Sequence, residues 1–172
     1  LGHHKKEYWP INKGFNNFFG LVKKKLNDNE NKENWVHNSN FVTDSTFSID
    51  LIPSSVTKYI NDYSSNNPYF LFISFPGPGS PIFLPKSIDK KKISDREKYT
   101  YMVKSIDSAI GDITKAIENK IKKENVLLFF HSDNGGAVKS KYPTNDGDVS
   151  VTTANNGPFR SGKGTFYEGG IR

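Results

Sequence analysis

The residues best suited to chemistry gather at two places, and the first is the run FFHSDNGG, Phe129 to Gly136. Asp133 carries carboxylate oxygens and Asn134 an amide oxygen, and adjacent donors of this kind suit a hard cation such as calcium or magnesium. The two glycines that follow permit a tight turn that a side chain would block. Asp-Asn-Gly-Gly is also favoured in ordinary turns, so local chemistry leaves both a metal site and a plain turn open.

The second place is the glycine-rich stretch NNGPFRSGKGTFYEGGIR, Asn155 to Arg172, in which Lys163 stands between two glycines. Glycines around a lysine let the backbone come close to an anion while the ammonium points at it. A solvated surface lysine is the alternative, because the chain contains 21 lysines and only 3 arginines.

A helix and a strand lead into the first of these places. Apolar residues recur at three- and four-residue steps from about Asp95 to Lys123, which predicts a helix with one buried face. The next segment, Val126–Phe130, is apolar at every position, which is typical of a strand covered on both faces in a parallel sheet. Ligands gather beyond the carboxyl ends of such strands, where His131 to Asn134 follow.

A second buried strand is predicted at Tyr69–Phe75, between Asn-Asn-Pro and Pro-Gly-Pro-Gly. We expect it to neighbour the strand at 126–131 in one mixed sheet, with the 95–123 helix packed on its face. Earlier in the chain, a short helix capped by Asp44 or Ser45 is predicted to be interrupted by Pro53 and followed by a further turn or two. The polar stretches 23–40 and 137–157 are predicted to be loop insertions.

Composition narrows the class of protein. The net charge of +6 and pI of about 9.3 suit an acidic partner such as nucleic acid, a membrane surface or a sulfated glycan. Scarce arginine disfavours nucleic acid, and the apolar stretches are too short to span a bilayer. The absence of cysteine excludes a disulfide, a cysteine zinc site and a thiol nucleophile within this sequence. The 172 residues suit one domain, and we expect an internal piece of a longer protein, because the chain lacks an initiator methionine and stops where an apolar segment begins.

Five pieces of the sequence resemble, in order, the sulfatase family and in particular its arylsulfatase B-like branch. They are LGHHKKEYWPINKGFNNFFG, PYFLFISFPGPGSPIFLP, YMVKSIDSAIGDITKAI, VLLFFHSDNGG and NNGPFRSGKGTFYEGGIR. Together they cover nearly the whole chain. The combination of SDNGG with the later RSGKGTFYEGGIR is the most specific part of the resemblance.

The resemblance implies an α/β fold, an alkaline phosphatase-like sandwich with a mixed, mostly parallel sheet and helices on both faces. Residues 1–172 would be an internal part of its single catalytic domain. It implies a cation, usually calcium, with Asp133 and Asn134 matching one pair of ligands and an Asp pair upstream supplying another. Lys163 matches the lysine that holds the sulfate oxygens. The nucleophile, a formylglycine made from Cys or Ser in a Cys-x-Pro-x-Arg motif, would lie upstream, so this piece alone would be inactive.

The sequence departs from the family pattern at several positions. Gly79 stands where the family has a histidine that contacts the sulfate ester and assists protonation of the leaving group. His131 stands where Ser or Thr is common, and we interpret it as a packed or capping residue rather than a catalyst. His3 and His4 come after the family's Lys-x-His pair and are not its equivalents. Asn16 replaces an Asp of the family.

Three hypotheses follow from the resemblance. The first is a calcium-dependent sulfuric ester hydrolase whose substrate is a sulfated carbohydrate or an aryl sulfate, such as a sulfated sugar of a glycosaminoglycan. The second, favoured by Gly79, is a catalytically impaired pseudoenzyme that binds sulfated glycan. The third, a phosphate-ester hydrolase of the wider superfamily, is disfavoured by the YEGGIR piece. The resemblance implies a lysosomal or secreted protein, with no membrane span and no nucleic-acid partner.

Overall fold

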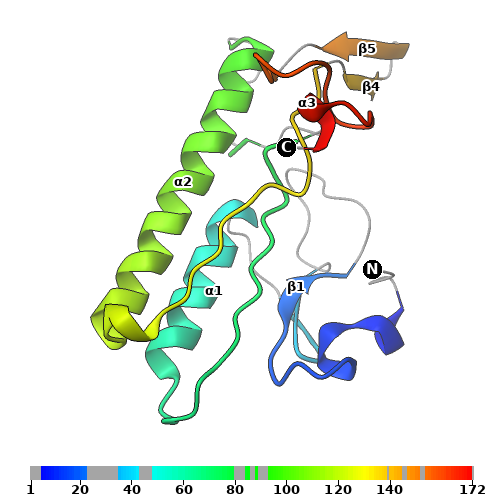
Figure 1. The fold of residues 1–172 in the computed structure, drawn as a ribbon. Helices are drawn as coiled ribbons and strands as arrows, with labels where there is room; N and C mark the ends of the chain where they lie inside the picture. The colour runs from blue at the N-terminus through cyan, green and yellow to red at the C-terminus, as the bar shows by residue number, and fades with distance from the viewer. Residues whose placement is uncertain are drawn as a thin grey trace.

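The structure is a computed structural model that describes residues 5–22, 35–42, 48–79, 84–85, 88, 93–138, 140–144, 147–151 and 154–171. Two helices lie side by side, a small sheet packs beside the first of them, and the C-terminal stretch gathers at the far end of the second (Figure 1). Short 3-10 helices at Lys6–Tyr8 and Pro10–Asn12 precede the first strand.

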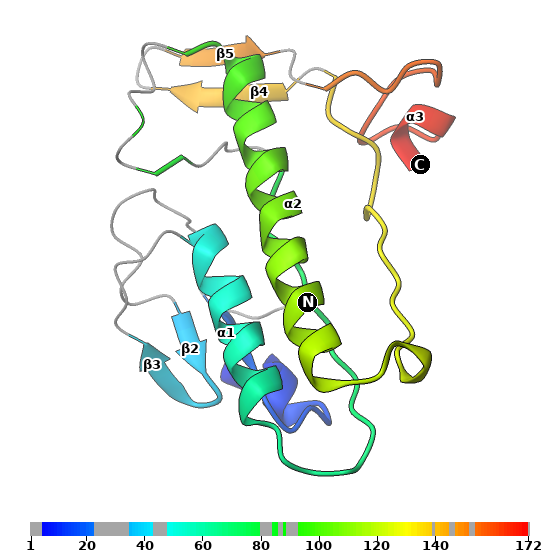
Figure 2. The same cartoon turned by 90° about the vertical axis from the view of Figure 1, so that its left-hand side faces the viewer.

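The helices α1 (Ser48–Asp62) and α2 (Asp95–Lys120) form one packed layer (Figure 2). The apolar stripe predicted for the second helix is confirmed: Met102, Ile106, Ala109, Ile113 and Ala116 are buried, at steps of three and four residues. Ile60 of α1 lies against this stripe and is fully buried. Helix α2 ends at Lys120, three residues before the predicted end, because Ile121 is extended; a 3-10 turn, Lys123–Asn125, follows.

Pro53 lies inside α1, so the prediction that it interrupts the helix is wrong. A proline removes one backbone hydrogen bond from a helix. Nearby side chains bond to the backbone around it: Thr57 Oγ1 donates to the Pro53 carbonyl oxygen at 2.8 Å, and Ser54 Oγ donates to that of Leu51 at 3.0 Å. Leu51 and Ile52, directly before the proline, are buried in a cluster with Trp35, and this burial offsets the lost hydrogen bond. The cap predicted at Asp44 or Ser45 lies outside the described residues.

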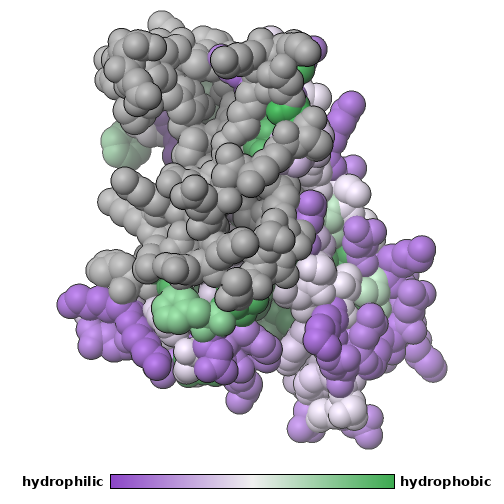
Figure 3. Space-filling view, turned by 180° about the vertical axis from the view of Figure 1, so that it is seen from behind, coloured by the Kyte–Doolittle hydropathy of each residue, from purple (hydrophilic) through white to green (hydrophobic). Residues whose placement is uncertain are grey.

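One face of the molecule is polar over much of the surface that the structure describes. Seen from behind, hydrophilic residues cover most of the described surface toward the lower end, with a smaller hydrophobic patch among them (Figure 3). This distribution agrees with a chain in which charged residues make up 24% of the sequence.

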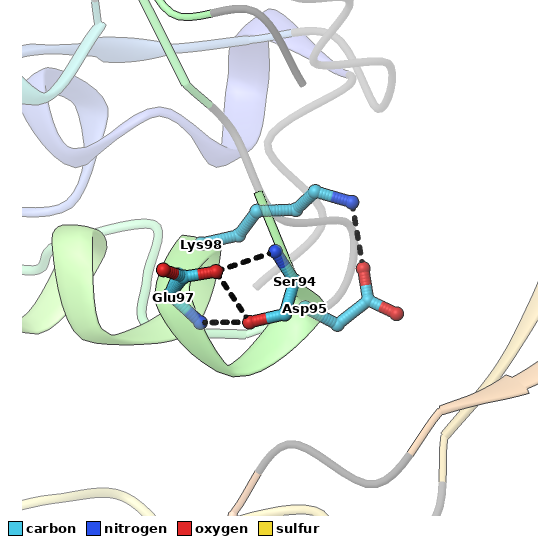
Figure 4. Close-up of polar contacts among 4 residues, drawn as sticks. All are labelled: Ser94, Asp95, Glu97 and Lys98. Atoms are coloured by element: carbon cyan, nitrogen blue, oxygen red, sulfur yellow. Dashed lines mark hydrogen bonds and ion pairs between the residues drawn. The ribbon is translucent and has the colours of Figure 1, made fainter. Parts of the chain in front are cut away.

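A capping box begins α2 (Figure 4). The Ser94 hydroxyl accepts a hydrogen bond from the Glu97 backbone N–H at 3.2 Å, and the Glu97 carboxylate accepts one from the Ser94 N–H at 2.7 Å. Lys98 pairs with Asp95 at 2.7 Å in the same turn. Two N–H groups that a helix start leaves unpaired are thereby satisfied.

The segments predicted as buried strands are extended but belong to no sheet among the described residues, so the predicted mixed, mostly parallel sheet stays a prediction. In Tyr69–Phe75, Leu71, Ile73 and Phe75 pack on the helices, whereas Phe70 is 73% exposed. In Val126–Phe130, Leu127 and Phe129 are each 81% exposed. Both segments keep extended backbone, but a strand also needs a neighbour for its N–H and C=O groups, and none of the described residues supplies one.

The sheets that do form are antiparallel. Strands β1 (Phe19–Leu21), β2 (Trp35–His37) and β3 (Asn40–Val42) pair in that order. Trp35 is buried, stacks on Phe19 with ring centroids 5.1 Å apart, and packs with Leu51 of α1. The end of the predicted loop 23–40 is therefore a buried strand and a turn, while 23–34 lies outside the described residues.

Strands β4 (Ser140–Thr144) and β5 (Gly147–Val151) form a two-stranded hairpin within the other predicted loop, 137–157. That loop therefore contains regular structure; whether either stretch is an insertion stays a prediction. The last element is the short helix α3 (Glu168–Ile171). It lies with the hairpin at the end of the molecule where α2 begins (Figure 1).

Candidate active site

The turn Asp133–Gly136 follows the extended segment 126–131 at the end of the molecule that also holds α3 and the β4–β5 hairpin (Figure 2). Local hydrogen bonds shape the turn: Ser132 Oγ donates to the Asn134 carbonyl oxygen at 2.6 Å, and Asn134 Nδ2 donates to that of Gly135 at 2.9 Å. Asp133 is exposed and Asn134 half-buried. With its amide nitrogen engaged within the turn, Asn134 keeps its amide oxygen for another partner.

The donor set of this turn fits part of a calcium site. Within the part of the chain that the structure describes, neither the Asp133 carboxylate nor Asn134 Oδ1 accepts a hydrogen bond. A carboxylate and an amide oxygen are calcium ligands, but calcium takes about six to eight oxygens. The described residues contain no group of three or more His, Cys, Asp or Glu side chains that could hold a metal ion. Further ligands would have to come from elsewhere.

The glycine-rich stretch is bonded directly to this turn. The Gly135 N–H donates to the Gly170 carbonyl oxygen at 3.0 Å, and the Lys163 N–H donates to that of Gly136 at 3.1 Å. A Cβ at Gly162 would collide with the Gly136 carbonyl oxygen, so the two backbones touch there. The structure thus brings together the two places that sequence analysis singled out, 30 residues apart from Asp133 to Lys163.

Lys163 occupies a tight, exposed loop. Gly164 has φ +87°, a conformation that favours glycine, and Ser161 also has positive φ, at 68°. The Thr165 hydroxyl and N–H both donate to the Gly162 carbonyl oxygen, at 2.8 and 3.2 Å. Lys163 makes no ion pair with the described residues. Its predicted role, like those of Asp133 and Asn134, stays a prediction.

Asn156 is a polar residue of this region that sequence analysis missed. Its Nδ2 donates to the carbonyl oxygens of Gly136 at 2.8 Å and Ser161 at 3.0 Å, and its Oδ1 accepts from the Gly136 N–H at 2.9 Å. Asn156 belongs to the stretch Asn155 to Arg172 that the sequence analysis singled out, but an Asn-Asn pair before Gly-Pro is typical of any turn and gave it no role of its own. Close by, the Arg160 guanidinium lies 4.0 Å from the centroid of the Tyr167 ring.

The remaining positions considered in the sequence analysis are Gly79 and the histidines His131, His3 and His4. No described atom lies within 4 Å of a Cβ built on Gly79, so packing against the described residues does not require a glycine there. His131 is exposed, which contradicts a packed role, and its Nδ1 lies 3.1 Å from the Ser132 carbonyl oxygen. His3 and His4 lie outside the described residues.

A shallow groove of about 600 Å³ lies between α1 and α2, away from these residues. It is lined mainly by small and polar side chains, among them Asp50, Thr57, Asp112 and Lys115. Burial raises the pKa of the Asp50 carboxyl. None of the residues that sequence analysis selected lines this groove. The described helices also include none that is long and apolar enough to cross a membrane.

Comparison with solved structures defines the fold. Ps i-CgsB in complex with k-i-k-neocarrahexaose aligns with a TM-score of 0.79 at 22% identity, over 98% of this chain and 40% of that one. A second crystal structure of Ps i-CgsB gives a TM-score of 0.76. The likeness supports an α/β fold and places the chain among proteins with this architecture.

Sequence comparison then identifies the family. The Sulfatase family model matches residues 2–172, and the chain belongs to the sulfatase family. Human N-acetylgalactosamine-6-sulfatase is 25% identical over 185 residues, covering 98% of this chain and 34% of the human protein. Mouse arylsulfatase J is 26% identical over 194 residues, covering 100% and 29%. The chain therefore spans about a third of the length of these curated relatives.

Proposed function

We propose that this chain is part of a calcium-dependent sulfuric ester hydrolase. The observation that carries the proposal is the direct bonding of the Asp133–Gly136 turn to the Lys163 loop through the Gly136 carbonyl oxygen. That contact joins a pair of oxygen donors and a lysine, in a chain that the Sulfatase family model matches over residues 2–172. The substrate is a sulfated carbohydrate or an aryl sulfate, such as a sulfated amino sugar of a glycosaminoglycan.

Each residue has a distinct task in this proposal. Asp133 and Asn134 would contribute one carboxylate and one amide oxygen to a calcium ion, which would supply positive charge to the site. The Lys163 ammonium binds sulfate oxygens and offsets the negative charge that develops during transfer. The formylglycine nucleophile and the remaining calcium ligands come from sequence outside these residues. The net charge of +6 favours approach of an anionic substrate.

A catalytically impaired sulfatase-like protein that binds sulfated glycan is the second candidate. Gly79 favours it, because glycine supplies no proton at the position where the resembling family has histidine. No described atom lies within 4 Å of a Cβ built on Gly79, so the described residues leave room for the first atom of a side chain there. By resemblance, either protein would be lysosomal or secreted.

Calcium binding tests the first part of the proposal. The full-length protein, co-expressed with a formylglycine-generating enzyme, is titrated with calcium by calorimetry and assayed on an aryl sulfate. We expect Asp133→Ala to abolish calcium binding and turnover, while Asp107→Ala, an exposed aspartate of α2, leaves both unchanged. Calcium affinity that survives Asp133→Ala would establish that this run is a plain turn.

Gly79→His separates the two candidates. General acid assistance is worth about 10²–10⁴ in rate, and it matters most for poor leaving groups such as sugars. We expect slow hydrolysis of a sugar sulfate by the parent, a gain of that order in Gly79→His, and a smaller gain on an aryl sulfate. A parent without activity on either substrate that still binds calcium would favour the impaired protein. Ordinary rates on the sugar sulfate, with no gain from Gly79→His, would refute the role given to position 79.

A further inference from the structure

Asn156 uses its whole amide group to hold two loops together. Both Nδ2 protons are donated, to the Gly136 and Ser161 carbonyl oxygens, while Oδ1 accepts the Gly136 N–H. The orientation of the amide follows from its neighbours, because reversing it would set Oδ1 against two carbonyl oxygens. The backbone N–H and the backbone C=O of Gly136 are thus both bonded to one side chain.

The two loops joined in this way are those of the proposed site. Gly136 follows Asn134 by two positions, and Ser161 precedes Lys163 by two. The Gly136 carbonyl oxygen also accepts the Lys163 N–H, so Asn156 and Lys163 share one acceptor. A Cβ at Gly162 would lie 2.9 Å from Asn156 Nδ2, and a Cβ at Gly136 would lie 3.1 Å from Asn156 Oδ1, which shows how closely the amide is packed.

The neighbouring Asn155 provides the contrast. It is exposed, and its Oδ1 accepts only the Gly157 N–H, at 2.9 Å, two residues along the chain. That bond shapes a local turn and joins nothing distant in sequence. Asn156 is half-buried and bonds to a residue 20 positions away.

We propose that Asn156 is a positioning residue that sets the distance between the cation-binding turn and Lys163. The proposal rests on the function proposed above. A cation at Asp133 and Asn134 and an ammonium at Lys163 act on the same sulfate group only if their separation is maintained. Asn156 maintains this separation by bonding to the backbones of both loops, at Gly136 and Ser161, and not to the side chains of Asp133 or Lys163. Calcium binding and sulfate binding are therefore coupled through this amide.

Two substitutions test the role in the full-length protein. Asn156→Ala removes all three bonds without adding charge. Asn156→Asp keeps the shape and the acceptor for the Gly136 N–H, but places an oxygen against the Gly136 and Ser161 carbonyl oxygens. Asn155→Ala is the matched control. Calcium and inorganic sulfate are titrated by calorimetry, sulfate both with and without calcium, and hydrogen exchange is followed at the Gly136 amide.

We expect each Asn156 variant to lose about 10–100-fold in calcium affinity, the usual effect of removing a group that orients a metal ligand. Calcium should increase the sulfate affinity of the parent but have almost no effect on that of the variants. A general loss of stability would not produce this change in a variant that is folded. The Gly136 amide, protected in the parent, should exchange faster in Asn156→Ala. Asn155→Ala should match the parent in all three measurements.

Affinities within twofold of the parent in a folded variant would overturn the positioning role while leaving the proposed function intact. A parent that binds neither calcium nor sulfate would overturn the proposed function itself, and the positioning role with it. Should Asn156→Ala fail to fold, Asn156→Asp is the deciding variant. Rapid exchange of the Gly136 amide in the parent would by itself refute the Asn156 bond.

Discussion

The helix pair and the extended segments use similar apolar residues, but the helices bury theirs far more completely. Met102 of α2 and Ile60 of α1 are fully buried, whereas Leu127 and Phe129 in the extended segment 126–130 are each 81% exposed. A helix satisfies its backbone within itself and needs a partner only for its side chains, and each of these helices supplies one for the other. An extended segment needs neighbours for both.

The exposed apolar residues of the extended segments indicate where further strands would pack. The curated relatives are about three times the length of this chain, which covers 34% of human N-acetylgalactosamine-6-sulfatase. We expect strands from outside these 172 residues to pair with 69–75 and 126–130 and to cover Phe70, Phe72 and Phe129. The substitutions below compare the helix pair with the extended segments. The first, Phe129→Ala, depends most on whether further strands cover the segment 126–130.

Phe129→Ala should destabilise two lengths of the protein to very different extents. In the 172-residue chain the ring is exposed, so its removal should change the free energy of unfolding by no more than about 0.5 kcal/mol. In the full-length protein, with the segment covered, the cost should rise to about 3–5 kcal/mol. Urea unfolding of both lengths measures the difference. A small effect in both would mean that the segment stays uncovered.

Ile60→Ala should destabilise both lengths alike, by about 2–5 kcal/mol, because its site between the helices is complete within this chain. Val103→Ala, at a position of α2 that is 42% exposed, is the matched control and should cost much less. The same urea titrations report both variants. If Ile60→Ala were costly only in the full-length protein, the packing around Ile60 would not be complete within this chain.

Ser94→Ala removes the hydroxyl that caps α2 and should cost about 1 kcal/mol. Ser108→Ala, an exposed position inside the same helix, should be neutral or slightly stabilising, because alanine is the better helix former. Thermal unfolding followed by circular dichroism compares the two. Equal effects would show that the capping box contributes nothing measurable.

The smallest effect concerns pH. The Ser94 hydroxyl, and then the Ser94 backbone N–H, lower the pKa of the Glu97 carboxyl below its ordinary value of 4.5. A lowered pKa in the folded state means that the ionised carboxylate stabilises the fold above the unfolded pKa, and that this contribution is lost as the pH falls through the folded value. The stability difference between the parent and Glu97→Gln should therefore shrink below about pH 4.5. A difference that is constant from pH 7 to 3 would contradict the assignment.

Prediction from the sequence was correct where the apolar pattern was long and periodic. The stripe from Met102 to Ala116 extends over several turns, so it specified both the helix and its buried face. Strand β2 was missed because three residues after a polar run show no periodicity, and its burial depends on Phe19 and Leu51, distant in sequence. The interruption predicted at Pro53 was wrong because local propensity was outweighed by burial of the neighbouring Leu51 and Ile52 beside Trp35.

Some residues of the candidate site could be predicted from the sequence and others could not. Asp133, Asn134 and Lys163 could be chosen from residue type and neighbouring glycines, which are local properties. Asn156 could not, because its importance lies in bonds to Gly136 and Ser161, and a turn-forming Asn looks the same in sequence whether or not such bonds exist.

By itself, the sequence determined the elements whose stabilising contacts are close along the chain: the long helix, its buried stripe, and the two polar, glycine-rich runs. Only the tertiary structure decided that those runs touch at Gly136 and that Asn156 joins them. It also decided that 69–75 and 126–130 remain extended without a sheet. The physical reason is that helix formation needs hydrogen bonds within four residues, whereas strand pairing and loop contacts need partners whose positions no local pattern encodes.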